Sequence, residues 1–304
     1  TPPDYSLIWG AVIKRLWPRV YWVADIWDDP RVYRVGGESV ALRCVARLFN
    51  WVVVRALRRA DLVITIGVRT DDHLPHTLIS EFGVAPRRIL PVTNGIDLEM
   101  FAPTTRSQSA GCPGEFRLLY VGSVIKYLGI GDVLESVRDL VPRIPNIRLT
   151  LVGWSTPADE KWLAETISSL EIEEHVDCRG VVHAEQVPAI IEASDVCIYP
   201  FPSRGYLDVV FPVKVYEYLA MSKPVVATAL PGVLTILRHE ENGLVVEPED
   251  SKSLASAILE LYSDESLRQR LARNARPSIQ QYGWSSVNRK VIDALSALPG
   301  RSEC

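Results

Sequence analysis

Hydrophobic and polar positions alternate along this chain with two periods. Short apolar runs of four or five residues predict strands buried on both faces. Between most of them lie segments with apolar residues at helical spacing, which predict amphipathic helices. The predicted strands are Val20–Ala24, Leu62–Ile66, Ile89–Val92, Arg117–Val121, Arg148–Val152, Val176–Arg179, Val196–Tyr199, Val225–Thr228 and Gly243–Val246.

The longest predicted helix, Glu38–Arg59, is basic, with Arg43, Arg47, Arg55, Arg58 and Arg59 between its apolar positions. A turn is predicted at Pro231-Gly232. Strands that alternate with amphipathic helices are typical of an α/β fold with a parallel sheet covered on both faces. The other predicted helices are Asp132–Leu140, Ala158–Leu170, Glu185–Ala193, Pro212–Met221, Lys252–Tyr262 and Glu265–Gln281.

A polar stretch rich in Gly, Pro, Ser and Thr, Pro103–Gly114, divides this pattern into two periodic halves. Such a composition is typical of a linker, and 304 residues are enough for two domains. We therefore predict an N-terminal domain over residues 1–102, a linker over 103–115 and a C-terminal domain over 116–283.

Composition narrows the class of protein. Apolar residues make up 47% and charged residues 23%, which is typical of a globular chain. The net charge of −4 argues against a nucleic-acid partner. Five cysteines without C-x-x-C spacing indicate a reducing compartment and argue against a zinc site. We expect a cytoplasmic protein.

The first sixty residues differ from the rest. They contain ten Lys and Arg against five Asp and Glu, and five of the eight tryptophans. A basic, aromatic segment is typical of a surface that contacts lipid, so we expect peripheral contact with the inner face of a membrane. The alternative is an ordinary domain edge with solvated basic residues. The tryptophans are Trp9, Trp17, Trp22, Trp27 and Trp51.

Three predicted strands of the second half are followed at their carboxyl ends by glycine, at Gly122, Gly153 and Gly180. Ligands of parallel α/β sheets bind beyond the carboxyl ends of the strands. A glycine there lets the backbone approach a phosphate or a base, and the next helix offers N–H groups to an anion. Each glycine alone is explained as well by a tight turn. Three in succession favour a nucleotide site.

The helix predicted after Pro212 carries the other candidate chemistry. Lys214 and Glu217 lie three residues apart, on one side of that helix. A carboxylate one turn inside a helix at the ligand edge can accept hydrogen bonds from a ribose or sugar hydroxyl. Alternatively, Glu217 forms an ion pair with Lys214 on a solvated face.

Residues 212–228, PVKVYEYLAMSKPVVAT, resemble the nucleotide-binding signature of retaining GT-B glycosyltransferases of family 4. Supporting matches extend over about residues 20–295; each is weak alone, but their order is specific. They are Ala60–Thr65, Val92–Asp97 with Phe101, Leu119–Ser123, Leu151–Gly153, Arg179–Val181, Ser194–Val196 with Tyr199-Pro200, Glu241–Val246 and Trp284.

The resemblance implies two Rossmann-like domains and a retaining transfer of sugar from a nucleoside-diphosphate sugar, UDP- or GDP-linked. The acceptor would be a glycan, a glycolipid or a lipid-linked molecule in cell-surface polysaccharide or glycoconjugate synthesis. No cofactor or metal is implied, and the sequence has no Asp-x-Asp triplet and no His cluster beyond His73 and His76. A helix over 284–304 would pack back toward the N-terminal domain, which we expect to lack roughly its first half.

Carried over residue by residue, the resemblance places the donor in the C-terminal half. Glu217 matches the second carboxylate of the family's E-x7-E pattern, which binds the ribose hydroxyls. The helix after Pro212 and the Gly122-Ser123 turn would approach the diphosphate, and Gly180–Val182 would hold the base. The donor-binding candidates are Gly122, Ser123, Lys126, Gly153, Gly180, Val181, Val182, Arg204, Pro212, Val213 and Glu217.

The sequence departs from the family pattern at several positions. The first glutamate of E-x7-E is Val209, with Asp208 beside it, and the usual Arg and Lys after the first glycine are Ser123 and Leu128. The usual N-terminal histidine is Ala24, followed by Asp25 on the acceptor side. The cation beside the leaving diphosphate is then Lys126 or Lys214, with Arg204 third. The catalytic candidates are Glu217, Lys214, Asp25 and Asp208.

These departures keep a second hypothesis open, a non-catalytic nucleotide-binding remnant or fragment of the same fold. A third hypothesis is a sugar epimerase of related fold. That chemistry needs acid and base groups in one cleft, and the sequence has no carboxylates and histidines spaced to supply them.

Overall fold

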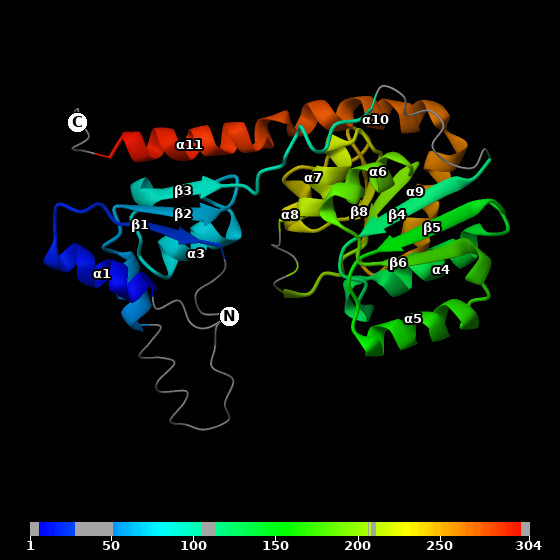
Figure 1. The fold of residues 1–304 in the computed structure, drawn as a ribbon, viewed down its shortest axis with the longest axis horizontal. Helices are drawn as coiled ribbons and strands as arrows, with labels where there is room; N and C mark the ends of the chain where they lie inside the picture. The colour runs from blue at the N-terminus through cyan, green and yellow to red at the C-terminus, as the bar shows by residue number, and fades with distance from the viewer. Residues whose placement is uncertain (1–5, 28–50, 105–113, 206, 208–210, 299–304) are drawn as a thin grey trace. The chain divides into compact units, whose positions relative to one another are not determined.

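The computed structural model describes residues 6–27, 51–104, 114–205, 207 and 211–298, which form two compact units (Figure 1). Unit 1 comprises residues 1–95 and 285–304, and unit 2 comprises residues 96–284. The sequence placed the boundary at residue 102. In the structure Ile96 pairs with Gly283, and the Arg276 guanidinium donates to the Leu98 and Phe101 carbonyls, so residues 96–101 belong to unit 2. Most of the predicted linker lies outside the described residues.

Unit 1 is built on a parallel sheet in the order β1-β2-β3. Strands β2 (Leu62–Ile66) and β3 (Ile89–Val92) lie where the apolar runs predict them. Strand β1 is Val23–Ile26, so the predicted range Val20–Ala24 was wrong. Val20 is 46% exposed, whereas Ile26 is buried, so the buried part of this segment begins later than the apolar letters suggest.

Helices α1 (Ser6–Leu16) and α3 (His73–Ser80) of unit 1 were not predicted. The apolar residues of α1 itself lie on several sides of the helix, so its sequence does not show the one-sided pattern of an amphipathic helix. The helix predicted over Glu38–Arg59 is described only from residue 51, and residues 51–57 are helical. Arg43 and Arg47 lie outside the described residues. Helix α11 (Trp284–Ser296) runs alongside β3 (Figure 1), where the Lys290 ammonium donates to the Pro91 carbonyl.

Unit 2 contains a parallel sheet in the order β6-β5-β4-β7-β8-β9. The chain moves outward from β4 through β5 to β6, returns to β7 beside β4, and moves outward on the other side. Strand order therefore reverses between β4 and β7, the position where such sheets bind ligands. The strands are β4 (Phe116–Val121), β5 (Ile147–Val152), β6 (Val176–Gly180), β7 (Val196–Tyr199), β8 (Val225–Thr228) and β9 (Leu244–Val246).

Helices cover both faces of this sheet (Figure 1), with α4 packed on α9 and α10 packed on α7. A large core cluster joins the sheet to α4 and α9, and includes Leu118, Leu134 and Ile258. The predicted helices of unit 2 begin and end within two residues of the observed ones. The turn predicted at Pro231-Gly232 was wrong, because Pro231 begins the short helix α8. The helices are α4 (Ile130–Leu140), α5 (Pro157–Ser169), α6 (Val187–Glu192), α7 (Val213–Ala220), α8 (Pro231–Leu234), α9 (Ser251–Ser263) and α10 (Glu265–Ile279).

Within the described ranges no helix is long and apolar enough to cross a membrane.

Candidate functional site

The three strand-ending glycines are neighbours at the carboxyl edge of the unit 2 sheet. The Gly122 N–H donates to the Val152 carbonyl (2.9 Å), and the Gly153 N–H donates to the Gly180 carbonyl (2.8 Å). A Cβ at Gly153, where φ is +146°, would lie 1.7 Å from the Gly122 carbonyl oxygen. Gly153 therefore serves backbone packing. At Gly180, where φ is +62°, a Cβ would meet nothing within 4 Å, so this backbone borders open space.

The segment that follows Gly122 is tied to its neighbours through backbone groups. The Ser123 carbonyl accepts a hydrogen bond from the Tyr120 hydroxyl (2.9 Å). The Lys126 N–H donates a hydrogen bond to an Asp159 carboxylate oxygen (3.0 Å). This hydrogen bond, together with those from Thr156, holds the pKa of Asp159 below its usual range. The Lys126 ammonium lies 5.7 Å from the ring centroid of Trp162, so this predicted diphosphate ligand faces α5.

Helix α7 positions the predicted pair of charged residues. Pro212 is its N-cap residue, and the Lys214 ammonium donates to both carboxylate oxygens of Glu217, at 2.9 and 3.0 Å. The side chain of Glu217 is only 9% exposed and that of Lys214 is 32% exposed. Burial raises the pKa of Glu217, and Lys214 opposes that rise. The predicted pair exists, but Glu217 is not on a solvated face.

Tyr218 connects this helix to the strand end and was not among the predicted site residues. Its buried hydroxyl accepts a hydrogen bond from the Val121 N–H (2.8 Å), immediately before Gly122. The turn of α7 that carries Glu217 is thereby held beside the carboxyl end of β4. A spacing of four residues from Lys214 places Tyr218 on the same side of the helix, but such a spacing cannot reveal a contact with β4.

The structure places the remaining candidates less closely together. The Arg204 guanidinium pairs with Glu249 at 2.7 Å, and both side chains are about half exposed. Val181 is 72% exposed and Val213 is 38% exposed, whereas Val182 is half-buried. Asp25 is an exposed residue of β1 in unit 1. Asp208 lies outside the described residues.

The candidate site therefore consists of the glycine-bearing edge of the sheet and the Lys214–Glu217 pair, in which the carboxylate is buried and the ammonium partly exposed. A buried carboxylate can accept hydrogen bonds from hydroxyl groups, and a neighbouring ammonium can stabilise an anion. The described part of the chain contains no group of three His, Cys, Asp or Glu residues arranged as metal ligands.

A pocket of about 320 Å³ lies at the opposite, amino end of strands β4 to β6. Three arginines line it, and each is paired with a carboxylate at or beside the pocket. The pairs are Arg117 with Asp195, Arg148 with Glu115 and Arg179 with Asp177. This balance of charge indicates a structural role for the arginines.

The chain belongs to the family of glycosyl transferases group 1, whose family model matches residues 103–278. It is 28% identical over 230 residues to D-inositol 3-phosphate glycosyltransferase of Pseudarthrobacter chlorophenolicus, a match that covers 74% of this chain and 54% of the relative. Spore coat protein SA of Bacillus subtilis is 23% identical over 248 residues, covering 74% of this chain and 63% of that protein. The chain spans about half the length of the curated relatives it matches first.

Solved structures show the same α/β fold with parallel sheets, the GT-B fold. HepE of Anabaena, crystallised with UDP, aligns with a TM-score of 0.76 at 21% identity, over 96% of this chain and 76% of HepE. Sucrose-phosphate synthase of Thermosynechococcus elongatus aligns with a TM-score of 0.73 at 23% identity, over 95% of this chain and 71% of the synthase. At sequence identities of 21% and 23%, these alignments show a common fold and no more.

Proposed function

We propose that unit 2 carries the donor site of a retaining glycosyltransferase that uses a nucleoside-diphosphate sugar. The observation that carries the proposal is the ion pair between Lys214 and the buried carboxylate of Glu217. Tyr218 holds this pair beside the end of β4, at the point where strand order reverses. Family membership supports a sugar transfer, and the fold neighbour HepE was crystallised with UDP and with UDP-glucose.

In this proposal Glu217 accepts hydrogen bonds from the ribose hydroxyls of the donor. An ammonium has three N–H donors, of which Glu217 accepts two, so Lys214 retains one for a diphosphate oxygen. The Val213 N–H donates to the Phe211 carbonyl (2.9 Å), so the ammonium of Lys214, and not that N–H, would bind the anion. Lys214 then stabilises the charge that builds on the leaving diphosphate as the bond to the sugar carbon breaks and the acceptor oxygen bonds to that carbon.

The remaining roles follow from this assignment. Lys126 lies over Trp162 and Arg204 pairs with the exposed Glu249, whereas Lys214 lies beside the buried carboxylate that would bind the ribose. Lys214 would therefore be the principal cation, and the proposal includes no divalent metal. Asp208 would lie near the donor sugar, and Asp25 would act on the acceptor side. A non-catalytic nucleotide-binding remnant is the second candidate function, favoured by Ser123, Leu128 and Val209 at the family's charged positions.

Calorimetric titration of the 304-residue chain with UDP, GDP and ADP tests the donor site. We expect one of these nucleotides to bind, and Glu217→Gln to weaken that binding about tenfold or more, roughly 1.4 kcal/mol. Glu260→Gln is the matched control, since Glu260 is an exposed glutamate of α9. Failure of all three nucleotides to bind, or equal binding by both variants, would contradict the proposal. Turnover of the corresponding nucleotide sugar distinguishes the enzyme from the remnant.

We also propose that unit 1 contacts an anionic membrane through α1, which fits a lipid-linked acceptor at the cytoplasmic face. Leu7 is buried, but Trp9, Ile13 and Leu16, at helical spacing on the other side of α1, are 64%, 43% and 62% exposed. Arg15 is exposed beside them. An apolar helix face flanked by basic residues is typical of a helix that lies in a membrane interface.

Cosedimentation with vesicles tests this contact. We expect the chain to bind phosphatidylglycerol-containing vesicles and to bind neutral phosphatidylcholine vesicles much less. Replacing both Trp9 and Leu16 by serine should weaken binding about tenfold or more, because each apolar side chain that leaves water contributes on the order of 2 kcal/mol. Leu234→Ser, at a residue of unit 2 that is 52% exposed, should have no effect. Indifference to anionic lipid would eliminate the proposed contact.

A further inference from the structure

Trp154 is an exposed aromatic residue at the carboxyl edge of the unit 2 sheet. It follows Gly153 immediately after β5, and 56% of its surface is exposed. Among the described side chains, none stacks on its ring and none accepts a hydrogen bond from its indole N–H. Five other tryptophans of the described ranges are 43–64% exposed as well, so what distinguishes this indole is its position at the ligand edge of the sheet.

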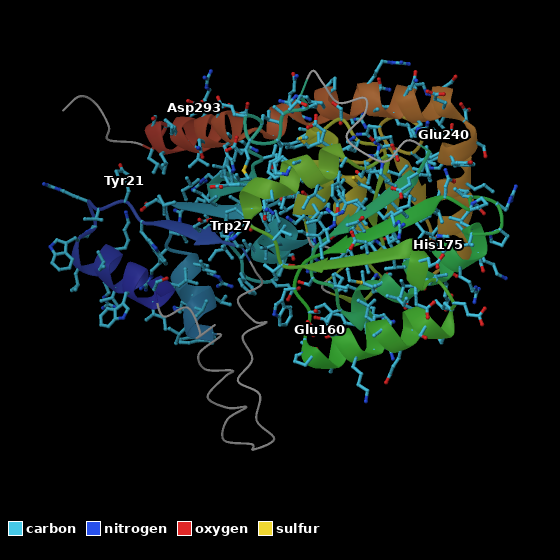
Figure 2. All side chains as sticks on the ribbon, turned by 45° about the vertical axis from the view of Figure 1, so that its right-hand side comes forward. Tyr21, Trp27, Glu160, His175, Glu240 and Asp293 are labelled. Carbon is cyan, nitrogen blue, oxygen red and sulfur yellow. The ribbon has the colours of Figure 1, made fainter. Side chains whose placement is uncertain are left out.

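The backbone that carries Trp154 is held on both sides. Its carbonyl accepts a hydrogen bond from the Val124 N–H (2.7 Å), on the segment after β4. The preceding residue, Gly153, donates to the Gly180 carbonyl at the end of β6. Beyond it, the Ser155 hydroxyl donates to Glu160 (2.9 Å), in the first turn of α5 (Figure 2). The indole is therefore presented from a well-anchored loop between two of the predicted donor-binding segments.

The neighbouring backbone on the β6 side leaves room for a ligand. A Cβ at Gly180 would meet nothing within 4 Å, and the next residue, Val181, is 72% exposed. An indole after the end of β5 and an uncovered glycine backbone at the end of the neighbouring β6 offer a surface for a flat ring. A nucleobase is such a ring, and stacking on tryptophan requires only a π-face and no particular edge.

The strand order gives the direction in which a nucleotide would lie. The Lys214–Glu217 pair follows β7, and Trp154 follows β5, with β4 between them. Two strand spacings amount to roughly 10 Å, a span that a ribose and a diphosphate can bridge. A nucleotide whose diphosphate lies at Lys214 therefore extends its base toward β5 and β6.

We propose that Trp154 is the stacking residue for the base of the donor nucleotide, with Gly180 and Val181 beside the ring. This assignment rests on the proposed donor site in unit 2. It makes Trp154 a positioning residue, which holds the base while Glu217 and Lys214 bind the ribose and the diphosphate.

Calorimetric titration of variants in the full chain tests the assignment. Stacking interactions of this kind predict that Trp154→Ala weakens nucleotide binding about tenfold, within a range of roughly 5- to 150-fold. Trp154→Phe keeps an aromatic face and should stay within about threefold of the unaltered chain. Inorganic pyrophosphate, which has no base, should bind the alanine variant and the unaltered chain equally. Trp17→Ala is the matched control, because Trp17 is also 56% exposed and lies in unit 1.

Each outcome decides a different question. If Glu217→Gln weakens nucleotide binding and Trp154→Ala does not, the stacking assignment is overturned while the donor site stands. If Trp154→Ala weakens pyrophosphate and nucleotide equally, the residue acts on the loop rather than on the base, and the assignment is again overturned. If the unaltered chain binds no nucleotide, the proposed function and this inference both fail.

Discussion

Alanine at position 153 is expected to destabilise unit 2 by about 3 kcal/mol or more. The added Cβ would lie 1.7 Å from the Gly122 carbonyl oxygen, far inside van der Waals contact. Forcing extra atoms into a packed site costs about 1–3 kcal/mol, and the φ of +146° adds strain of similar size in any residue with a side chain. The backbone cannot shift freely, since Gly153 donates to the Gly180 carbonyl. Urea denaturation of the full chain measures the loss.

Gly180→Ala is the matched control for this prediction. Gly180 also ends a strand and has a positive φ, +62°, but a Cβ there meets nothing within 4 Å. Only the left-handed backbone penalty of about 1–2 kcal/mol remains. Equal losses in the two variants would mean that backbone conformation, and not contact with Gly122, requires glycine at position 153.

The strands of this protein could largely be predicted from its sequence. Strands β2, β3, β7 and β8 coincide with continuous apolar runs, because a strand buried on both faces leaves little room for polar residues. Helix α1 could not be predicted in this way. Its exposed Trp9 and Leu16 lie opposite its buried Leu7, so the sequence has apolar residues on both sides and no amphipathic period.

The sequence located some residues of the candidate site but not Tyr218 or Trp154, and it did not indicate what each residue does. The pattern located Gly153 and Gly180 equally well, yet only the contact across strands with Gly122 shows that Gly153 serves packing. Likewise, a spacing of three residues predicted the Lys214–Glu217 pair but not the burial of Glu217. That burial depends on the packing of α7 against the end of β4, nearly a hundred residues away in the chain.

The partners of Lys126 and Arg204 could not be predicted from the sequence either. Lys126 has the charge expected of a diphosphate ligand, but its ammonium lies over Trp162 on α5. Arg204 is paired with Glu249, which follows β9. Both partners are more than thirty residues away in the chain, so a local pattern could not identify them. The sequence left Lys126 and Lys214 as equal candidates, and it indicated only the partner of Lys214, because Glu217 lies on the same helix.

Replacing Lys214 by methionine is expected to destabilise unit 2 by about 2–4 kcal/mol at neutral pH. Methionine keeps much of the apolar stem but removes the cation, so the carboxylate of Glu217, 9% exposed, is left buried without its partner. Breaking a buried pair on one side costs about 3–5 kcal/mol, and the partial exposure of Lys214 lowers that figure. Urea denaturation over roughly pH 4 to 8 measures the effect.

The loss should depend on pH in a defined direction. Burial raises the pKa of Glu217 above its ordinary value of 4.5, and removal of Lys214 takes away the charge that opposes this rise. The folded variant then holds the proton more tightly than the unfolded chain does. The loss of stability relative to the unaltered chain is therefore small at acid pH and grows as the pH rises from the ordinary pKa through the folded one.

The double variant Lys214→Met with Glu217→Gln should recover most of the stability at neutral pH, because no buried charge remains. A loss that is constant with pH, or a double variant as unstable as Lys214→Met alone, would show that Lys214 stabilises the helix by packing and not by its charge.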